Sequence, residues 1–476
     1  MKVLVVEPPN QCWPKDTPRP NGALGPAYLV AALRAADIEA DYYDGTVGFG
    51  FRTLDSSFYN RSVQENGLIR YGTSREGMAA VFAGYDVIAL SSIFTAQTRM
   101  HFEAIRIAKE VGEACGQPIG IVAGGVNARA LKKHFLAAGA DVVIEGDGEY
   151  ALVDFLKGIV RTNRTLIPLS AIPSPALHAL PLQVYWHLGI PHAGRLPAGR
   201  RFGAIQTSRG CQDHCSFCHI STEKRFAGDM GYLREFTVNQ VRRDVDNARA
   251  LGINRLYFED DNLFFNKKRL YTLAPYLKRP GLEYSNVNGA NLRFLFNRAS
   301  NTVDTEFIGM LADFGLCELM LPFESRSLAI MEQYSSAKYN PDAMDSGALV
   351  KALKAAGIRV QGNFMIGFPD ESWDSVLRTR DFAEEMMSAG MDACGFMIPV
   401  PYPGSLDFER LAPEYHKAFD RDPLSFTDRM HWREKPIFPT LVPGEQLHEA
   451  ASRFWFELNN PEYVQEKTKD VVNEKL

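Results

Sequence analysis

Short apolar runs rich in β-branched residues alternate with helical patterns twice along this chain, and this repetition limits the possible folds more than any other feature. Alternation of this kind is typical of parallel sheets covered by helices. The first series falls within residues 1–160, where five strands are predicted at Lys2–Glu7, Glu39–Tyr43, Asp86–Ser92, Pro118–Ala123 and Asp141–Ile144. The class is therefore α/β, and we predict a doubly wound N-terminal domain.

The second series falls within residues 201–405 and contains six predicted strands: Phe202–Thr207, Arg255–Phe258, Tyr284–Asn288, Glu318–Pro322, Arg359–Ile366 and Ala393–Pro399. Six such units predict a partial (β/α)6 barrel with its chemistry at the carboxyl ends of the strands. Residues 161–200 contain several prolines and no sustained period, so we expect a linker that runs over the surface. Residues 406–476 predict a helical C-terminal region.

Charge and hydropathy exclude some classes of partner. The formal net charge of −5 gives no basic field that would attract nucleic-acid phosphates. Apolar runs are interrupted before the roughly 18 residues needed to cross a bilayer, and no secretory signal follows Met1. We therefore expect a cytoplasmic protein with neither nucleic acid nor a membrane as its partner.

Three of the seven cysteines lie together in the loop after the first strand of the second series. Cys211, Cys215 and Cys218 have the spacing Cys-x3-Cys-x2-Cys, which suits a metal site in a reducing compartment better than disulfides. Three thiolates can bind three irons of a [4Fe–4S] cluster, which leaves the fourth iron for a small molecule with amino and carboxylate groups. The alternative is a zinc site, for which His214 or His219 would be the fourth ligand.

This cluster loop, with an aromatic residue before its last cysteine, resembles that of the radical S-adenosylmethionine (SAM) superfamily. Four later segments resemble the strand-end motifs of its cobalamin-associated branch, in the same order: Phe258–Asn262, Phe323–Ser325, Gly362–Glu371 and Pro401–Gly404. The N-terminal half resembles the Rossmann-like cobalamin-binding domain of that branch. The resemblance implies an enzyme with a [4Fe–4S] cluster and SAM.

The resemblance also implies a SAM site in the barrel, made of Phe217, Asp260, Glu324, Ser325, Ile366 and Gly367. Phe217 would line the adenine pocket, and Asp260 with its neighbours would hold the methionine amino group. Glu324 and Ser325 would meet the ribose or the methionyl part, while Ile366 and Gly367 would pass along the adenine. Asp260 also precedes a predicted helix, so a helix-capping role is an equal alternative.

Cobalamin is the cofactor that the resemblance implies for the first domain. In open doubly wound sheets, ligands bind outside the carboxyl ends of the strands. The candidate residues at these ends are Ser91, Ser92, Thr95, Gly124, Gly125, Glu145 and Gly146. The alternative is a domain retained for structure or for substrate binding. An insertion at residues 45–75 is predicted either to roof the cofactor or substrate or to be a plain surface excursion.

Two radical reactions are compatible with these features. The first is a cobalamin-dependent C-methyltransferase, in which a 5′-deoxyadenosyl radical removes hydrogen from a small-molecule or natural-product substrate. The second is a cobalamin-independent dehydratase, deoxygenase or cyclase acting on a sugar or other natural-product intermediate. A non-catalytic cobalamin or iron–sulfur module is a third alternative, which the accompanying SAM motifs disfavour. The resemblance further implies an electron donor such as flavodoxin or ferredoxin, and the sequence assigns no catalytic acid or base.

Overall fold

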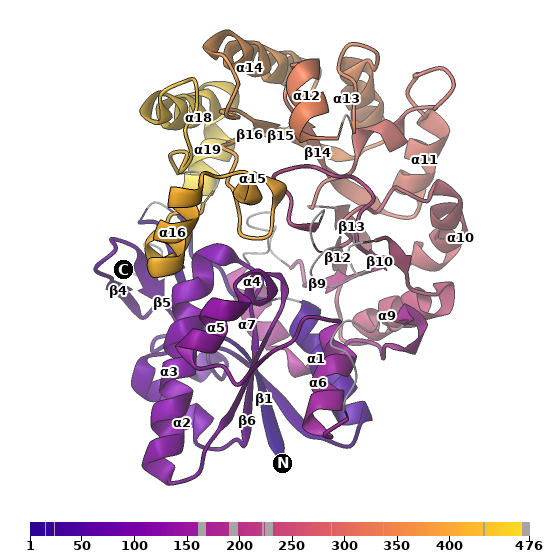
Figure 1. Ribbon diagram of the computed structural model, residues 1–476. Helices are drawn as coiled ribbons and strands as arrows, with labels where there is room; N and C mark the ends of the chain where they lie inside the picture. The colour runs from indigo at the N-terminus through magenta and orange to yellow at the C-terminus, as the bar shows by residue number, and fades with distance from the viewer. Residues whose placement is uncertain are drawn as a thin grey trace.

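The computed structural model describes residues 1–14, 16–22, 24–159, 168–189, 199–220, 223, 232–286, 288–336, 338–431 and 434–468. In Figure 1 the first domain, in indigo and purple, lies below a pink-to-orange barrel. The orange and yellow C-terminal helices run from the barrel down to the first domain. In the described parts of the chain, no helix is both long and apolar enough to cross a membrane.

The first domain contains a five-stranded parallel sheet with the order β3-β1-β6-β7-β8. Its strands are β1 (Lys2–Glu7), β3 (Glu39–Asp44), β6 (Val87–Ser91), β7 (Gly120–Gly124) and β8 (Val142–Val143). The direction of winding changes between β1 and β6, which is the switch point where such sheets bind ligands. The predicted doubly wound domain is confirmed.

Helices cover both faces of this sheet and bury its alternating side chains. One face packs against α1 (Leu24–Ala35) and α6 (Gly148–Leu156). The other packs against α2 (Arg75–Phe82), α3 (Thr98–Cys115) and α5 (Lys132–Ala138). Both cores consist mainly of Val, Leu, Ile and Ala, as expected for a parallel sheet buried on two sides.

The second domain contains six parallel strands that neighbour one another in chain order, with β9 and β16 at the edges. They are β9 (Phe202–Ile205), β12 (Arg255–Phe258), β13 (Glu283–Asn286), β14 (Leu316–Glu324), β15 (Arg359–Met365) and β16 (Ala393–Met397). The helices that connect them are α9 (Val238–Ala250), α10 (Lys267–Leu277), α11 (Thr305–Asp313), α12 (Leu328–Tyr334), α13 (Ser346–Ala355) and α14 (Trp373–Ser388). The predicted partial (β/α)6 barrel is confirmed.

A polar network closes the amino end of the barrel interior. Glu318 accepts hydrogen bonds from Arg255 at 2.7 Å, from Ser285 at 3.2 Å and from Gln361 at 2.6 Å. These contacts show which side of each strand faces inward. Since side chains alternate along a strand, a residue four positions beyond Arg255 faces the interior again, at the carboxyl end.

The segment predicted as a surface linker differs from that expectation. Its described part forms η3 (Leu169–Ala171), η4 (Leu177–Ala179) and α7 (Leu182–Leu188). Ile172 and Tyr185 are each 1% exposed and belong to the main core. Elements of three to seven residues are too short to show a period in the sequence. Residues 160–167 and 190–198 lie outside the described part of the chain.

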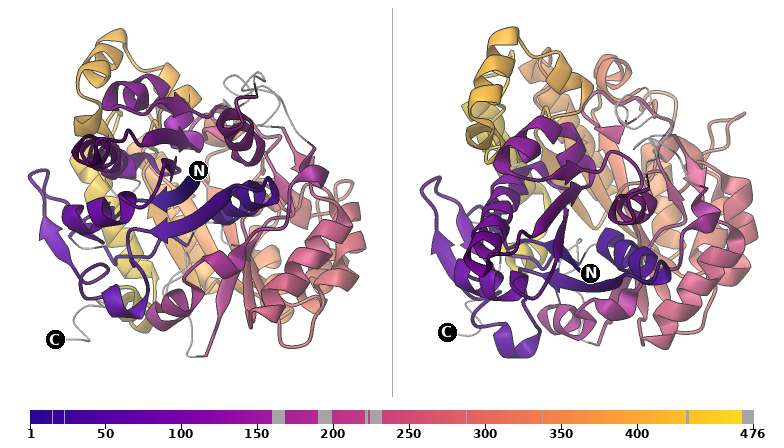
Figure 2. Two further views of the ribbon diagram at one scale, coloured as in Figure 1. Left: turned by 90° about the horizontal axis from the view of Figure 1, so that it is seen from below. Right: turned by 60° about the horizontal axis from the view of Figure 1, so that its bottom comes forward.

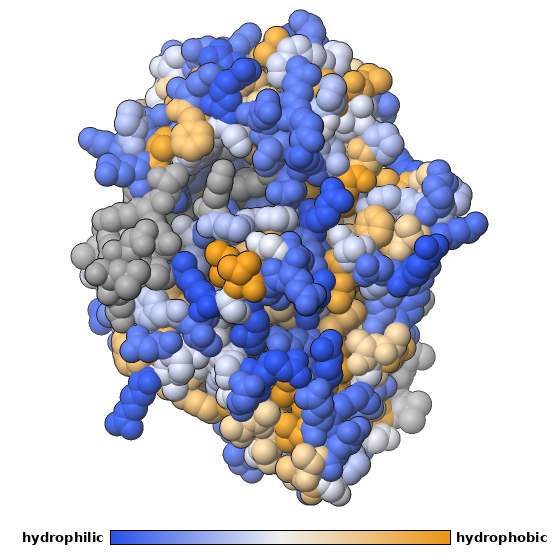
Figure 3. All heavy atoms as spheres, turned by 90° about the vertical axis from the view of Figure 1, so that its left-hand side faces the viewer, coloured by the Kyte–Doolittle hydropathy of each residue, from blue (hydrophilic) through white to orange (hydrophobic). Residues whose placement is uncertain are grey.

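The insertion at residues 45–75 contributes to a small antiparallel sheet with the order β2-β5-β4. Its strands are β2 (Asn10–Cys12), β4 (Arg61–Val63) and β5 (Ile69–Tyr71), and the sheet lies at one side of the molecule (Figure 2). This side, shown in Figure 3, is dominated by hydrophilic side chains, with hydrophobic ones in small groups. The insertion is therefore an ordered part of the first domain.

The C-terminal region packs against both domains. It contains α15 (Leu406–Glu409), α16 (Pro413–Arg421), α17 (Pro423–Thr427), α18 (Gly444–Leu458) and α19 (Pro461–Thr468). On the first domain, buried Asp428 accepts hydrogen bonds from Gln11, Asn66 and Arg99, each at 2.9 Å. On the barrel, Phe454 of α18 contacts Phe396 of edge strand β16. The region thus joins the two domains.

Candidate functional site

The cysteine loop leaves the carboxyl end of β9 and is fixed at several points. Its approach, β10 (Ser208–Arg209), pairs with β11 (Arg234–Glu235). Asp213, between the first two cysteines, forms an ion pair with Arg293 at 2.9 Å and accepts a hydrogen bond from Asn291 at 2.7 Å. The amide of Ser216 donates to the carbonyl of Tyr334 at 2.8 Å. The loop therefore has a defined conformation.

The three thiols lie in a setting that suits an iron–sulfur cluster. All three are free, Cys215 is buried, and Cys211 and Cys218 are partly buried. Burial raises the pKa of all three thiols, that of Cys215 to about 11, so metal loading must displace protons. Among the described residues, no three His, Cys, Asp or Glu side chains converge as a single metal ion requires. A cubane has no such requirement, because each thiolate binds a different iron.

Asp260 fixes the start of the cysteine loop by hydrogen bonds. It is fully buried, and its carboxylate accepts hydrogen bonds from the Thr207 amide at 3.0 Å, the Thr207 hydroxyl at 2.7 Å and the Ser208 hydroxyl at 2.6 Å. The helix that it was expected to cap begins only at Lys267, with Asn266 as its cap. The capping alternative is therefore wrong.

The neighbouring Glu259 directly follows β12, and strand alternation counted from Arg255 predicts that its side chain faces the barrel interior. Burial and the charges of Asp260 and Asp261 raise the pKa of Glu259 to about 7. Asp261 is exposed and accepts the amide of Gly210 at 2.7 Å. Of the three consecutive carboxylates, Glu259 is the one that alternation directs to the interior.

Glu324 ends β14 beside a residue that the sequence analysis missed. Its carboxylate lies 2.6 Å from the ammonium of Lys338, and the two side chains are 7% and 11% exposed. Glu324 has φ 59°, a strained conformation for a non-glycine residue that is common at functional sites. Lys338 also lies 5.8 Å from the ring centroid of Phe217 and lowers the pKa of Cys215, although burial of that thiol dominates. Lys338 is not part of any motif, so the sequence did not indicate a functional role for it.

Phe217 also lies against an apolar wall. Its ring centroid is 6.1 Å from that of Phe368, which stacks on Tyr334 at 4.6 Å. Met365 and Met397 join the same group. Such a wall fits the flat face of an adenine, the part of SAM expected beside Phe217.

The remaining SAM candidates have structural partners. The fully buried Ser325 hydroxyl accepts the amide of Ser327 at 3.1 Å. Ile366 is fully buried, and Gly367 has φ 90°. A Cβ at Gly367 would lie 2.7 Å from the Leu447 side chain of α18, so a larger residue there would disturb the C-terminal packing. Their contact with SAM stays a prediction.

The first-domain candidates line up at the carboxyl edge of its sheet. Ser91 pairs with Gly124, and both are partly exposed. The Ser92 hydroxyl accepts from Asn127 at 3.0 Å, and its backbone oxygen would lie 2.3 Å from a Cβ at Gly125. Glycine at 125, with φ 95°, is therefore needed by the turn itself.

Two further candidates lie in or near the next loops of this edge. Thr95 is buried at the start of η2 (Thr95–Gln97). Glu145 forms an ion pair with Lys132 at 3.1 Å, and Gly146 follows it. The structure therefore brings the predicted cobalamin candidates to one edge, and cofactor contact stays a prediction.

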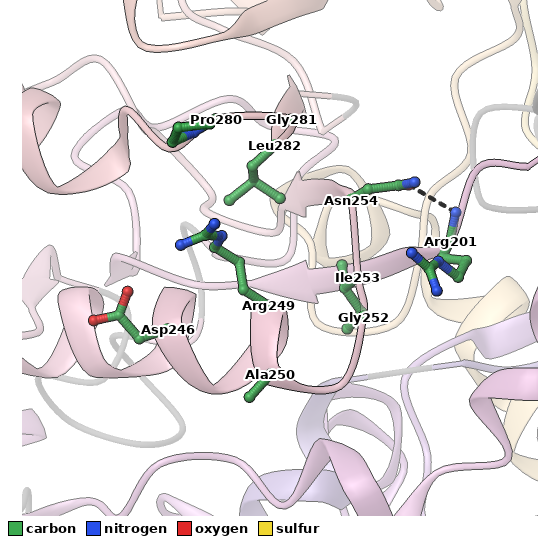
Figure 4. Close-up of a pocket in the computed structure, with 10 residues that line it drawn as sticks. All are labelled: Arg201, Asp246, Arg249, Ala250, Gly252, Ile253, Asn254, Pro280, Gly281 and Leu282. Atoms are coloured by element: carbon green, nitrogen blue, oxygen red, sulfur yellow. Dashed lines mark hydrogen bonds between the residues drawn. The ribbon is translucent and has the colours of Figure 1, made fainter.

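A separate surface pocket of about 420 Å³ lies at the opposite, amino end of the barrel (Figure 4). Its lining includes Arg201, Arg249 and Asn254, and the Arg201 amide donates to Asn254 at 2.8 Å. None of the residues predicted for the cluster, SAM or cobalamin lines it. We assign it no role in the chemistry.

The comparison with known families decides the identity of the barrel. Residues 205–383 match the radical SAM superfamily. The barrel is a radical SAM domain. As in other radical SAM proteins, its cofactors are a [4Fe–4S] cluster and SAM, and the buried thiolate loop described above fits the cluster.

Two radical SAM proteins of known structure share this fold over most of the chain. The radical SAM methyltransferase TsrM from Kitasatospora setae aligns with a TM-score of 0.58 and 16% identity over 86% of this chain and 75% of TsrM. OxsB, whose structure contains aqua-cobalamin and SAM, aligns with a TM-score of 0.60 and 16% identity over 96% of this chain and 62% of OxsB. In sequence, the chain is 26% identical to cytidylyl-2-hydroxyethylphosphonate methyltransferase from Streptomyces wedmorensis, over 95% of the chain and 89% of the relative.

Proposed function

We propose that this radical SAM protein is a cobalamin-dependent C-methyltransferase acting on a small-molecule or natural-product substrate. The observation that carries the proposal is the direct contact between the cysteine loop and the carboxyl edge of the first sheet. Arg209, two residues before Cys211, lies 2.6 Å from Glu149, at the start of α6. A cofactor on that edge would face the barrel mouth. The names of the methyltransferase relatives and the aqua-cobalamin in OxsB support the same reaction.

In this proposal, the barrel residues hold SAM in one orientation beside the cluster. Lys338 binds the carboxylate of the SAM methionine and Glu259 binds its amino group. Each charged group of SAM therefore meets a side chain of opposite charge. The wall formed by Phe217 and Phe368 packs against the adenine and excludes water. When bound, the cluster supplies an electron that cleaves SAM and cobalamin supplies the methyl group. An external donor such as flavodoxin or ferredoxin provides the electron.

The reaction class is tested by an anaerobic assay with reductant, SAM and candidate metabolites. Formation of both 5′-deoxyadenosine and S-adenosylhomocysteine is expected, because radical initiation consumes one SAM and supply of the methyl group consumes another. Formation of 5′-deoxyadenosine alone, with a substrate product that lacks a new methyl group, would contradict methylation. That outcome would favour the dehydratase, deoxygenase or cyclase alternative.

The affinity for SAM should depend on pH through Glu259. Because the pKa of Glu259 is raised to about 7, its carboxylate is mostly protonated at pH 6 and ionised at pH 8. Only the ionised form attracts the amino group, so the SAM dissociation constant should be about tenfold higher at pH 6 than at pH 8. Equilibrium binding to the cluster-loaded protein measures this. Glu259→Gln should remove the pH dependence, and an unchanged pH profile in that variant would contradict the assignment.

Bulk at the first-domain edge should displace cobalamin and leave the cluster in place. Ser91→Trp is suited to this test because Ser91 is partly exposed and ends its strand, whereas Gly125 has no space for a Cβ. In protein produced with hydroxocobalamin, we expect cobalt to fall at least about tenfold and iron to stay unchanged. Ser91→Ala is the matched control. Full cobalt in Ser91→Trp would place the cofactor elsewhere, and cobalt-free wild-type protein that cleaves SAM with substrate would contradict cobalamin dependence.

A further inference from the structure

The cysteine loop is attached to the first domain at both of its ends. Before the loop, the Arg209 guanidinium lies 2.6 Å from Glu149 and 3.2 Å from Asp147. After the loop, Glu223 forms an ion pair with Arg129. These partners belong to two neighbouring elements at the carboxyl edge of the first sheet. Asp147 and Glu149 lie after β8, and Arg129 lies in α4 (Val126–Ala130), after β7.

The contact at Arg209 is well defined by its surroundings. The side chains of Asp147 and Glu149 are 3% and 5% exposed, and that of Arg209 is 17% exposed. The guanidinium carbon lies 5.2 Å from the ring centroid of Tyr28 and 5.5 Å from that of Phe236. A guanidinium held by two carboxylates and two rings has little freedom to reorient.

Asp147 has a second partner on the barrel side, which strengthens the attachment. Arg234 in β11 lies 2.6 Å from Asp147, and β11 is the strand that pairs with Arg209 in β10. One carboxylate thus joins both strands of the ribbon that leads into the cysteine loop. Displacement of Asp147 would move the first cysteine, because Cys211 follows Arg209 by only two residues.

We propose that Arg209 and Glu223 are positioning residues, through which the first domain holds the cysteine loop in the geometry that binds SAM. The inference deepens the proposed function, since Glu145 and Gly146 at the predicted cobalamin edge directly precede Asp147. A change in the first domain at that edge is therefore transmitted to the cluster. The conformation of the cysteine loop therefore depends on residues outside the barrel. Residues that contact metal ligands, and not the metal itself, tune metal sites generally.

The test is the response of the reduced cluster to SAM, followed by electron paramagnetic resonance, together with the iron content. Arg209→Met removes the charge and retains the length, and the SAM concentration at half-conversion of the signal should rise about 10- to 100-fold. Arg209→Lys should restore part of the affinity. The matched control is Arg70→Met, which breaks a similarly buried pair with Glu103 (3.0 Å) in the first domain and should leave the SAM response unchanged.

An unchanged SAM response in Arg209→Met with full iron content would overturn the proposal. If that variant fails to fold or to hold iron, Glu149→Gln and Arg129→Met decide, since each weakens one attachment and leaves the cysteine loop's own sequence intact. A wild-type SAM response in both would equally overturn it. The measurement needs no cobalamin, so the absence of cobalt or of methyl transfer would contradict the proposed function and leave this inference standing.

Discussion

Replacing Cys215 with alanine should abolish the formation of 5′-deoxyadenosine from SAM. A cubane deprived of one thiolate is labile, and the iron that binds SAM is then no longer defined. Cys215 is buried at 6% exposure. The backbone N–H of the next residue, Ser216, donates a hydrogen bond to the carbonyl of Tyr334. Cys211→Ala and Cys218→Ala should have the same effect. Product chromatography and iron analysis of anaerobically reconstituted protein measure both quantities.

Two cysteines outside the loop provide the controls. Cys115 is exposed at the end of α3, and Cys317 lies in β14, where its thiol contacts the carbonyl of Tyr284 at 3.2 Å. Alanine at either position should leave iron content and SAM cleavage near the wild-type level. A triple variant of the loop cysteines with full iron and active SAM cleavage would refute the cluster assignment.

Lys338→Met should cause the second largest loss, in both stability and SAM affinity. Its ammonium is the buried partner of Glu324 at 2.6 Å, and removal of one partner leaves an uncompensated buried charge. Breaking such pairs typically costs about 3–5 kcal/mol in the free energy of unfolding. The proposed contact with the SAM carboxylate would be lost as well, so we expect the SAM dissociation constant to rise about 100-fold. Denaturant unfolding and equilibrium SAM binding measure the two effects.

The double variant Lys338→Met with Glu324→Gln separates these effects. Neutralising Glu324 removes the uncompensated charge, so part of the lost stability should return. SAM affinity should stay low, because the ammonium is still missing. Recovery of both quantities in the double variant would show that the ion pair serves structure alone.

The strands of both main sheets could be predicted because most of them are buried apolar runs bounded by turn residues. The predictions for Lys2–Glu7 and Arg255–Phe258 match β1 and β12. The small sheet escaped prediction, since β2 and β5 have three residues each and Asn10 pairs with Tyr71, far along the chain. Strands of that length carry no period of their own and depend on tertiary contacts.

The site was predictable only where its residues are close in sequence. The spacing of the three cysteines alone was enough to predict their role. Lys338 and Glu324 are brought together by the path of α12, and Arg209 meets Glu149 across 60 positions of sequence. Nothing in a single sequence states which of many charged residues will pair. Asp260 shows a second limit of the sequence. Helix capping was one of two equal expectations for this residue, whereas in the structure its carboxylate accepts a hydrogen bond from the Thr207 hydroxyl.

The C-terminal helices have a consequence for biosynthesis. They are translated after the strands of both sheets, yet Asp428 accepts hydrogen bonds from Gln11, Asn66 and Arg99, and Leu447 packs over Gly367. Domains generally fold as they emerge from the ribosome, N-terminal first. The two sheets can therefore form before the segment that fastens them together has been made. The contacts that join the two domains through the C-terminal region are therefore made to sheets whose strands have already been synthesised.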